Sequence, residues 1–247
     1  MLDVHPAHHA ATTWRDFFIH IATIVFGLLI AVGLEQTVEA VHRAHERNVL
    51  IEDIHAEAEH NLPVFDDNIK ANSQQKAWLK ASIAGINSAI SQSPAAGAAG
   101  HGPITVTLPP LAQFQGERAP SRAVWSVAQS NGKVALLPEN LAEVYDRLDY
   151  DAEQFFQARN GRFKVEVQMT AFETRFGVAI KPGVTLHLEA AAYDELSRLL
   201  ARYYAACNND NDWTAYWAGA ADAVLHNAQS RDKMTPYLDR HHASLPQ

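Results

Sequence analysis

Residues Phe17–Leu34 read FFIHIATIVFGLLIAVGL, eighteen consecutive positions without a formally charged side chain. The hydrocarbon core of a bilayer takes about 20 mostly apolar residues of helix, and a run of about 18 is the lower working limit. His20 and Thr23 are the polar side chains of this run, and a threonine hydroxyl can bond back to its own helix. Trp14 precedes the run, where an amphipathic ring favours the headgroup layer. The sequence therefore predicts a transmembrane helix over residues 17–34, after a short N-terminal tail of residues 1–16.

Two alternatives stay open for this run. Ala31 and Gly33 form a small-x-small pattern typical of a signal-peptide cleavage site, although Arg15 is the only strong cation before the run. A buried helix of a soluble protein is the second alternative, although such helices are usually shorter. Gly27 and Gly33 would let another helix approach closely, but their spacing differs from the four-residue spacing of the glycine dimer motif. We expect a permanent single-pass anchor.

Charge gives the orientation and excludes one class of partner. Arg15 lies much closer to the apolar run than Arg43 and Arg47 on its other side, which favours a cytoplasmic N-terminus and a main domain outside the cytoplasm. The formal net charge is −8 and no basic run is present, which disfavours nucleic-acid binding. The single cysteine, Cys207, excludes an internal disulfide, and we interpret it as a small buried residue on a helix.

The helical pattern continues beyond the apolar run. No Gly or Pro interrupts the chain from Leu34 to Leu62, and apolar residues return every three or four positions, which is typical of an amphipathic helix. Pro63 removes one helical hydrogen bond, so it either kinks this helix or starts a new one with Asn61 as a possible cap. We predict a helical stem and a return helix over residues 35–92, with an apolar pattern too irregular for a strict heptad seam.

The rest of the chain is predicted to be mainly α-helical. Residues 93–120 are a linker with a short β-type stretch, ITVTL at Ile104–Leu108. Residues 121–230 form a helical domain that contains a second short strand at Val184–Leu188. Residues 231–247 are expected to be loosely ordered. The predicted fold class is a transmembrane helix that continues into a long stem, followed by a helical domain with at most a two-stranded β element.

Polar and small residues predict where the helices of this domain begin and end. Ser121 is a candidate cap for a short helix from Arg122 to Ser130. Asn160-Gly161 is expected to end the helix that starts at Pro138. The run Asn208–Asp212 superficially resembles a calcium-binding loop, but it lacks the required Gly and the closing Glu. We therefore predict a polar loop with good capping residues.

Two stretches together carry a family resemblance. The first is Trp14-Arg15-Asp16-Phe17-Phe18 running into the apolar run, followed by Glu35, Glu46-Arg47 and Glu57 to Asn61. The second is AVWSVAQSNG at Ala123–Gly132, with Leu137 and the Tyr145 helix after it. They resemble an uncharacterised family of bacterial single-span membrane proteins, carried as a domain of unknown function, over roughly the first third of the chain and a shorter middle part. The resemblance implies an inner-membrane protein with a periplasmic domain, and it implies no catalytic residues. Pro63 departs from the family pattern, in which the helix continues.

Histidines are the strongest candidates for chemistry. His42, His55 and His60 each follow a glutamate by three positions, which is the Glu-x-x-His spacing of di-iron bundles. Such a site needs these pairs on facing helices, and here they share one helix with His45. We therefore interpret them as solvated helix surface, with a metal site between chains as the alternative. The terminal histidines, which we expect to be flexible, are His5, His8, His9, His241 and His242.

Aromatic residues at helical spacing predict a packed core, with a groove for a peptide or apolar ligand as the alternative. These residues are Trp125, Tyr203, Tyr204, Trp213 and Trp217. No hydrolase elbow, phosphate-binding loop or zinc-protease motif occurs in the sequence. The sequence therefore assigns no catalytic, cofactor-binding or metal-binding residue.

The expected function is that of a non-enzymatic, membrane-anchored protein that acts by protein–protein contact, as a scaffold or accessory subunit. Its expected partners are the lipid bilayer and either another protein or a second copy bound through the stem. One alternative is a periplasmic ligand-binding or sensory domain that signals through a partner, because only a short tail precedes the span. A metal-dependent enzyme that uses the stem histidines is the third possibility.

Overall fold

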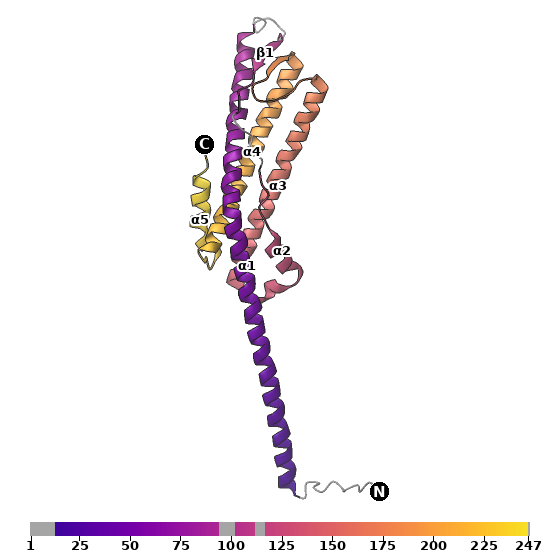
Figure 1. Cartoon of the computed structure of the whole chain (residues 1–247), viewed down its shortest axis with the longest axis vertical. Helices are drawn as coiled ribbons and strands as arrows, with labels where there is room; N and C mark the ends of the chain where they lie inside the picture. The colour runs from indigo at the N-terminus through magenta and orange to yellow at the C-terminus, as the bar shows by residue number, and fades with distance from the viewer. Residues whose placement is uncertain (1–12, 94–101, 112–116, 247) are drawn as a thin grey trace, which may run out of the picture. The chain divides into compact units, whose positions relative to one another are not determined.

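The computed structural model describes residues 13–93, 102–111 and 117–246. It has two compact units, the first ending at Val49 and the second beginning at Leu50. The predicted fold class, mainly α with a small two-stranded β element, is confirmed (Figure 1). The elements follow in the order α1 (Trp14–Gln92), β1 (Ile104–Thr107), α2 (Ala123–Ser130), a 3-10 helix (Lys133–Leu136), α3 (Glu139–Phe176), β2 (Thr185–Leu188), α4 (Ala190–Leu225) and α5 (Arg231–Ala243).

The helix α1 continues through Pro63 to Gln92, so the predicted return helix is wrong. Pro63 lies on the exposed side of the helix, where the carbonyl that loses its hydrogen bond can bind water. Its neighbours Asn61, Val64 and Phe65 are buried. Tertiary packing on both sides of the proline therefore holds this turn in helical geometry.

Two further predicted breaks are wrong, because α3 passes through Gly161 and α4 passes through the run Asn208–Asp212. A Cβ at Gly161 would meet nothing within 4 Å, and an exposed glycine weakens a helix by only about 1 kcal/mol. Asp210 and Asn211 are buried, and their side chains contact α3 and α1. These contacts outweigh the local preference of Asn and Asp for turns and caps.

The C-terminal region is ordered, contrary to the prediction, and forms α5. Met234 and Leu238 of this helix are buried. Gly219 of α4 permits the close approach, because a Cβ at Gly219 would lie 2.7 Å from the Leu238 Cα. Of the predicted linker, residues 94–101 and 112–116 lie outside the described residues.

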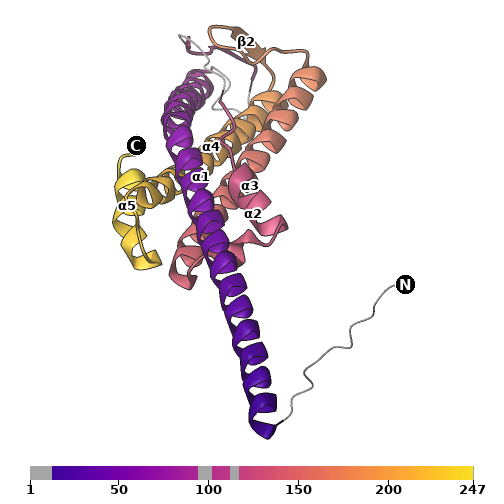
Figure 2. The same cartoon turned by 60° about the horizontal axis from the view of Figure 1, so that its bottom comes forward.

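The second unit is built on long helices that lie side by side, with the small sheet at one end (Figures 1 and 2). The helices α3 and α4 run in opposite directions. The antiparallel strands β1 and β2, both predicted, pair Ile104 with Leu188 and Thr107 with Thr185. Ile104 and Leu188 turn to the buried side of the sheet. The sheet therefore closes one end of the helical core.

A polar layer separates two apolar clusters in this unit. The first cluster surrounds Trp217, whose ring centroid lies 5.0 Å from that of Phe65 and 5.3 Å from that of Phe155. The second cluster contains Leu79 of α1 and Leu200 of α4, under the sheet. Buried polar residues, such as Asn72 of α1 and Asp210 of α4, occupy the interval between the two clusters along these two helices, and α3 places Arg162 against Asp210 at the same level.

Candidate functional site

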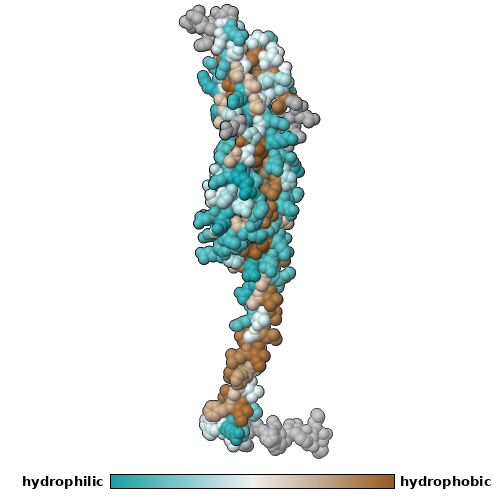
Figure 3. Space-filling model, turned by 90° about the vertical axis from the view of Figure 1, so that its left-hand side faces the viewer, coloured by the Kyte–Doolittle hydropathy of each residue, from teal (hydrophilic) through white to brown (hydrophobic). Residues whose placement is uncertain are grey.

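The helix of the first unit exposes large apolar side chains on every side. The exposed fraction is 66% for Phe26, 62% for Leu28 and 62% for Leu29, which point to different sides of the helix. Figure 3 shows this apolar surface in brown over the α1 segment of the first unit. Among the described residues, α1 is the one helix long and apolar enough to cross a membrane, and none of its most apolar window is buried. An exposed apolar surface of this extent marks a membrane or protein contact.

In the second unit, α1 buries polar residues instead. A series of buried positions from Leu50 to Ile86 repeats at intervals of four and three, which is the spacing of a heptad seam. The polar members of this polar seam are Asn61, Asn68, Asn72, Gln75 and Ser82. Because Asn68, Asn72 and Gln75 are three consecutive members of the series, a search for apolar periodicity alone does not detect the seam.

Two members of the polar seam, Asn61 and Asn68, bind the backbone of residues 117–123, a segment that we call the strap. Asn68 donates from Nδ2 to the carbonyl oxygen of Arg118 at 2.8 Å and accepts the Arg118 N–H at Oδ1 at 2.9 Å. Asn61 forms the same pair with Ser121, at 2.7 and 2.8 Å. One heptad of helix and three extended residues both span about 10 Å, so the two asparagines match the spacing of the two backbone positions.

A carboxylate of α1 holds the start of α2. Glu57 Oε1 accepts the N–H groups of Ala123 and Val124 at 2.8 and 3.3 Å, so its negative charge lies at a helix N-terminus. The Ser121 hydroxyl, expected to cap this helix, donates to Glu57 and lies 3.4 Å from the Ala123 nitrogen. The main cap therefore comes from a residue that is distant in sequence.

The strap also binds α3 through Arg122. The Arg122 guanidinium donates from Nε to Asp149 and from Nη1 to Glu153, both at 2.6 Å. The hydrogen bond from Arg122 lowers the pKa of Glu153. Backbone and side-chain contacts thus fix the strap on both α1 and α3.

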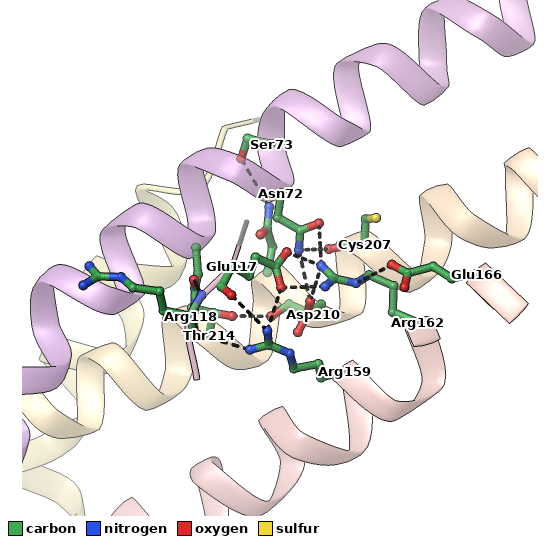
Figure 4. Close-up of polar contacts among 12 residues, drawn as sticks. Asn72, Ser73, Glu117, Arg118, Arg159, Arg162, Glu166, Cys207, Asp210 and Thr214 are labelled. Atoms are coloured by element: carbon green, nitrogen blue, oxygen red, sulfur yellow. Dashed lines mark hydrogen bonds and ion pairs between the residues drawn. The ribbon is translucent and has the colours of Figure 1, made fainter. Parts of the chain in front are cut away.

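The polar layer centres on Arg162 of α3, where side chains of three helices and the strap point toward one another (Figure 4). Arg162 Nη2 donates to Glu117 Oε2 at 2.5 Å, and Nη1 lies 2.8 Å from Asp210 Oδ2. Asn72 Oδ1 accepts from Nη1 at 3.3 Å, and Glu166 lies 3.5 Å from Nε. This buried cation is therefore bonded to both the strap and α4.

Negative charge exceeds positive charge in this layer, although Arg159 also lies 3.7 Å from Glu117. Burial raises the pKa of Asp210 to about 6, against the attraction of Arg162 and together with repulsion from Glu117. Asp210 Oδ1 has no hydrogen-bond partner among the described residues, which agrees with a carboxyl group that takes up a proton readily. Burial alone would lower the pKa of Arg162, but Glu117 and Asp210 outweigh it and raise that pKa. Burial also raises the pKa of Cys207 to about 12, which makes the thiol unreactive.

The arrangement acts as a structural ion-pair network. Its charged groups are bonded to one another, and breaking one buried pair leaves the other charge uncompensated. Tyr203 of α4 extends the network by donating its hydroxyl to Glu166 at 2.7 Å. Cys207, as predicted, is a buried small residue on a helix.

The stem histidines are distributed along α1 and do not come together at one site. His42 and His45 are exposed in the first unit, whereas His55 is half-buried and His60 exposed in the second. Burial lowers the pKa of His55. Within the described ranges, no three His, Cys, Asp or Glu side chains are grouped so that they could hold a metal ion.

The terminal histidines differ from one another in position. His5, His8 and His9 lie outside the described residues. His241 Nε2 lies 3.1 Å from Asp222, and His242 Nε2 lies 3.4 Å from Asp212. The last two, predicted to be flexible, therefore help to hold α5 on α4.

The predicted aromatic core is present, with Trp125 and Trp217 buried and Trp213, Tyr203 and Tyr204 half-buried. A cavity of about 20 Å³ lies beside Trp125, which is room for about one water molecule. A wider, open groove of about 500 Å³ is lined by α1 residues and by His241 near the end of α5. The cavity beside Trp125 is too small for an organic ligand.

Comparison of the chain with protein-family models, with curated proteins and with solved structures finds no match. The residues that hold the strap were missed by reasoning from the sequence. For Asn61 and Asn68 the signal is a seven-residue spacing, which Gln75 and Ser82 continue. A search for heptad spacing detects this signal when it accepts Asn, Gln and Ser, as well as apolar residues, at the buried positions.

Proposed function

We propose that this protein is anchored in a membrane by residues 17–34 and acts there by binding another protein. The observation that carries the proposal is the exposed apolar surface of the first unit, where Phe26, Ile30 and Leu34 would each face water without a bilayer. Burying such side chains stabilises each by about 1.5–3 kcal/mol. A bilayer supplies that burial along the whole span.

We further propose the bacterial inner membrane, with the N-terminus in the cytoplasm and the second unit in the periplasm. The charge next to the span supports this orientation, because Arg15 lies close to the apolar run and Arg43 lies farther from it. The resemblance to single-span bacterial membrane proteins supports the same location.

Binding to a protein is supported by the helix that follows the span. Val38 and Val41 are 63% and 65% exposed, beyond the end of the apolar run. The charged side chains nearby bond among themselves, as in the Arg43–Glu39 pair at 3.6 Å. An apolar stripe with charged residues on the other face of the helix is typical of a helix that packs against a partner.

The proposed role is non-enzymatic. In the second unit Asp210, whose pKa is raised, is engaged in the buried ion pair with Arg162. The alternative of a ligand-binding domain receives no support from the cavity beside Trp125, which has room for about one water molecule.

The test uses the full chain expressed in bacterial cells, with a variant carrying Leu28→Arg and Leu29→Arg as its control. We expect the wild-type chain to stay in the membrane fraction after an alkaline wash at its full intact mass, and the control to be extracted. A C-terminal reporter that is active only outside the cytoplasm should be active. Extraction of the wild-type chain, or a mass that corresponds to a chain beginning near Ala31–Gly33, would refute the anchor.

Chemical crosslinking in those membranes tests the protein contact. We expect a discrete crosslinked product that contains this chain. A chain that stays anchored but gives only monomer at all crosslinker concentrations would refute protein binding while leaving the anchor intact.

A further inference from the structure

The cavity beside Trp125 lies where several elements of the second unit meet. Its lining comes from α1, α2, α3, α4 and the strap. At about 20 Å³ it has room for about one water molecule. The polar side chains among its lining residues are Glu57, Asn61, Ser121, Arg122, Trp125 and Asp149. A cavity with polar groups on its wall is of the kind that binds water, whereas a purely apolar cavity stays dry.

The indole N–H of Trp125 is an independent observation at the same place. Trp125 is 4% exposed, and its Nε1 is buried without a hydrogen-bond partner among the described residues. An indole N–H is a donor only, and a buried tryptophan usually finds an acceptor for it. The ring packs edge-on against that of Tyr145, with 5.8 Å between the centroids, which holds its orientation. The Trp125 N–H therefore requires an acceptor inside the protein.

Trp78 shows the other way in which this chain satisfies a buried indole. Trp78 is 7% exposed, which is close to the value for Trp125. Its Nε1 donates directly to the carbonyl oxygen of Pro109 at 2.9 Å. Of these two buried indoles, one therefore bonds to the protein itself, and the other borders a cavity of the size of a water molecule.

A water molecule at Trp125 also needs acceptors for its own hydrogens, and the lining supplies them. A carboxylate has about four acceptor sites and a hydroxyl has two. Glu57 accepts from the Ser121 hydroxyl and from the N–H groups of Ala123 and Val124, which leaves capacity on its carboxylate. The Ser121 hydroxyl, 3.4 Å from the Ala123 nitrogen, has a second lone pair. Because the cavity admits a single water, its lining groups surround the same molecule.

We propose that this cavity binds one ordered water molecule, which accepts the Trp125 N–H and donates to Glu57 and Ser121. One accepted and two donated bonds match the roughly three hydrogen bonds that a buried water makes. Trp125 belongs to α2, Glu57 to α1 and Ser121 to the strap, so the water joins these three segments. The carboxylate that caps α2 is thereby also linked to the indole of the same helix. All lining residues belong to the second unit, so this inference does not rest on the proposed membrane anchor.

The test detects this water by NMR on the full chain in detergent, with nitrogen-15 in the tryptophan indoles. Trp125→Phe assigns the resonance, because it removes one of the five indole signals. We expect the Trp125 N–H to show a dipolar cross-peak with water, of the sign that a long-lived contact gives. The Trp78 N–H, which is bonded to Pro109, should show none. The bound water would be overturned by no cross-peak at Trp125, by one that arises from chemical exchange alone, or by equal cross-peaks at both indoles.

A second measurement locates the water in this cavity. Ala152→Val enlarges a buried residue of the lining, and we expect the cross-peak to be lost while the Trp125 indole signal remains. The matched control is Ala158→Val, because Ala158 is a buried alanine of α3 that lies outside the lining, and this variant should keep the cross-peak. Survival of the cross-peak in Ala152→Val, or its loss in both variants, would overturn this location. The wild-type measurement tests the proposal even if neither variant folds.

Discussion

The two parts of α1 differ in the kinds of side chain that they expose to the surroundings and bury in the protein. In the first unit, up to Val49, the helix exposes phenylalanine, isoleucine and leucine. In the second unit, from Leu50 on, the same helix buries asparagine, glutamine and serine at seam positions. The contrast shows that apolar content does not by itself determine which residues are buried. The surroundings of each part do: a bilayer in our proposal for the first, and a polar strap and ion-pair layer for the second.

The largest expected effect breaks the buried part of this contrast. Arg162→Met leaves Asp210 buried without its cation and leaves Glu117 with the more distant Arg159 alone. We expect a loss of about 3–5 kcal/mol in the free energy of unfolding. The measurement is urea unfolding of the full chain in detergent, followed by tryptophan fluorescence. The control is Arg175→Met, which removes a more exposed pair with Glu195 and should change stability by less than about 1 kcal/mol. Equal effects of the two substitutions would contradict the structural role of the layer.

The polar seam is tested next by Asn68→Leu. This substitution leaves the N–H of Arg118 without its partner and removes one of the two donors to the Arg118 carbonyl oxygen, the other being Arg159. We expect a loss of about 1–3 kcal/mol in the free energy of unfolding. Asn87→Leu is the control, because Asn87 is an exposed asparagine of the same helix. An Asn68→Leu variant as stable as the wild type would show that burial of apolar side chains alone suffices at this seam.

Glycines sharpen the comparison between the two units. In the second unit, Gly219→Ala brings a Cβ to 2.7 Å from the Leu238 Cα, and we expect a loss of about 1–3 kcal/mol from overpacking. In α3, Gly161→Ala meets open space and should stabilise by about 0.5–1 kcal/mol. Both are measured by the same unfolding assay, and a stabilising Gly219→Ala would contradict the close approach of α4 and α5.

The last prediction is a pH dependence of stability. The pKa of Asp210 is raised from 3.8 to about 6, so the folded chain binds this proton more tightly than the unfolded chain does. This group therefore stabilises the fold as pH falls below about 6, and that contribution is lost as pH rises from 3.8 through about 6. We expect Asp210→Asn to remove a difference on the order of 1–3 kcal/mol between pH 4 and pH 7. An unchanged pH profile in this variant would show that Asp210 is already ionised in the folded state at low pH.

Much of the fold could be predicted from the sequence, and the failures share one physical cause. The long apolar N-terminal helix, both strands and the buried Cys207 follow from apolar runs and residue type. Pro63, Gly161 and the run Asn208–Asp212 were expected to interrupt helices because of their local preferences. In the structure, distant contacts of their neighbours, such as those of Asp210 with Arg162, override those preferences.

The polar seam and the strap could not be predicted because their partners are backbone groups. Asn61 and Asn68 bind N–H and carbonyl groups of the strap, and every residue type except proline presents both. Glu57 caps a helix that begins far along the chain. Local sequence contains no sign of which segment will lie against the seam, although the seven-residue spacing of the amides was visible.

The most direct test of the contrast within α1 is an accessibility scan by single cysteines from Trp14 to Val49, in sealed vesicles with a membrane-impermeant maleimide. The native Cys207 is buried. We predict that residues 17–34 are protected on all faces of the helix and that Glu39 and Arg43 react readily. Reactivity that rises and falls with the helical period through residues 17–34 would mean that one face lies in water, and it would contradict a membrane span in the first unit.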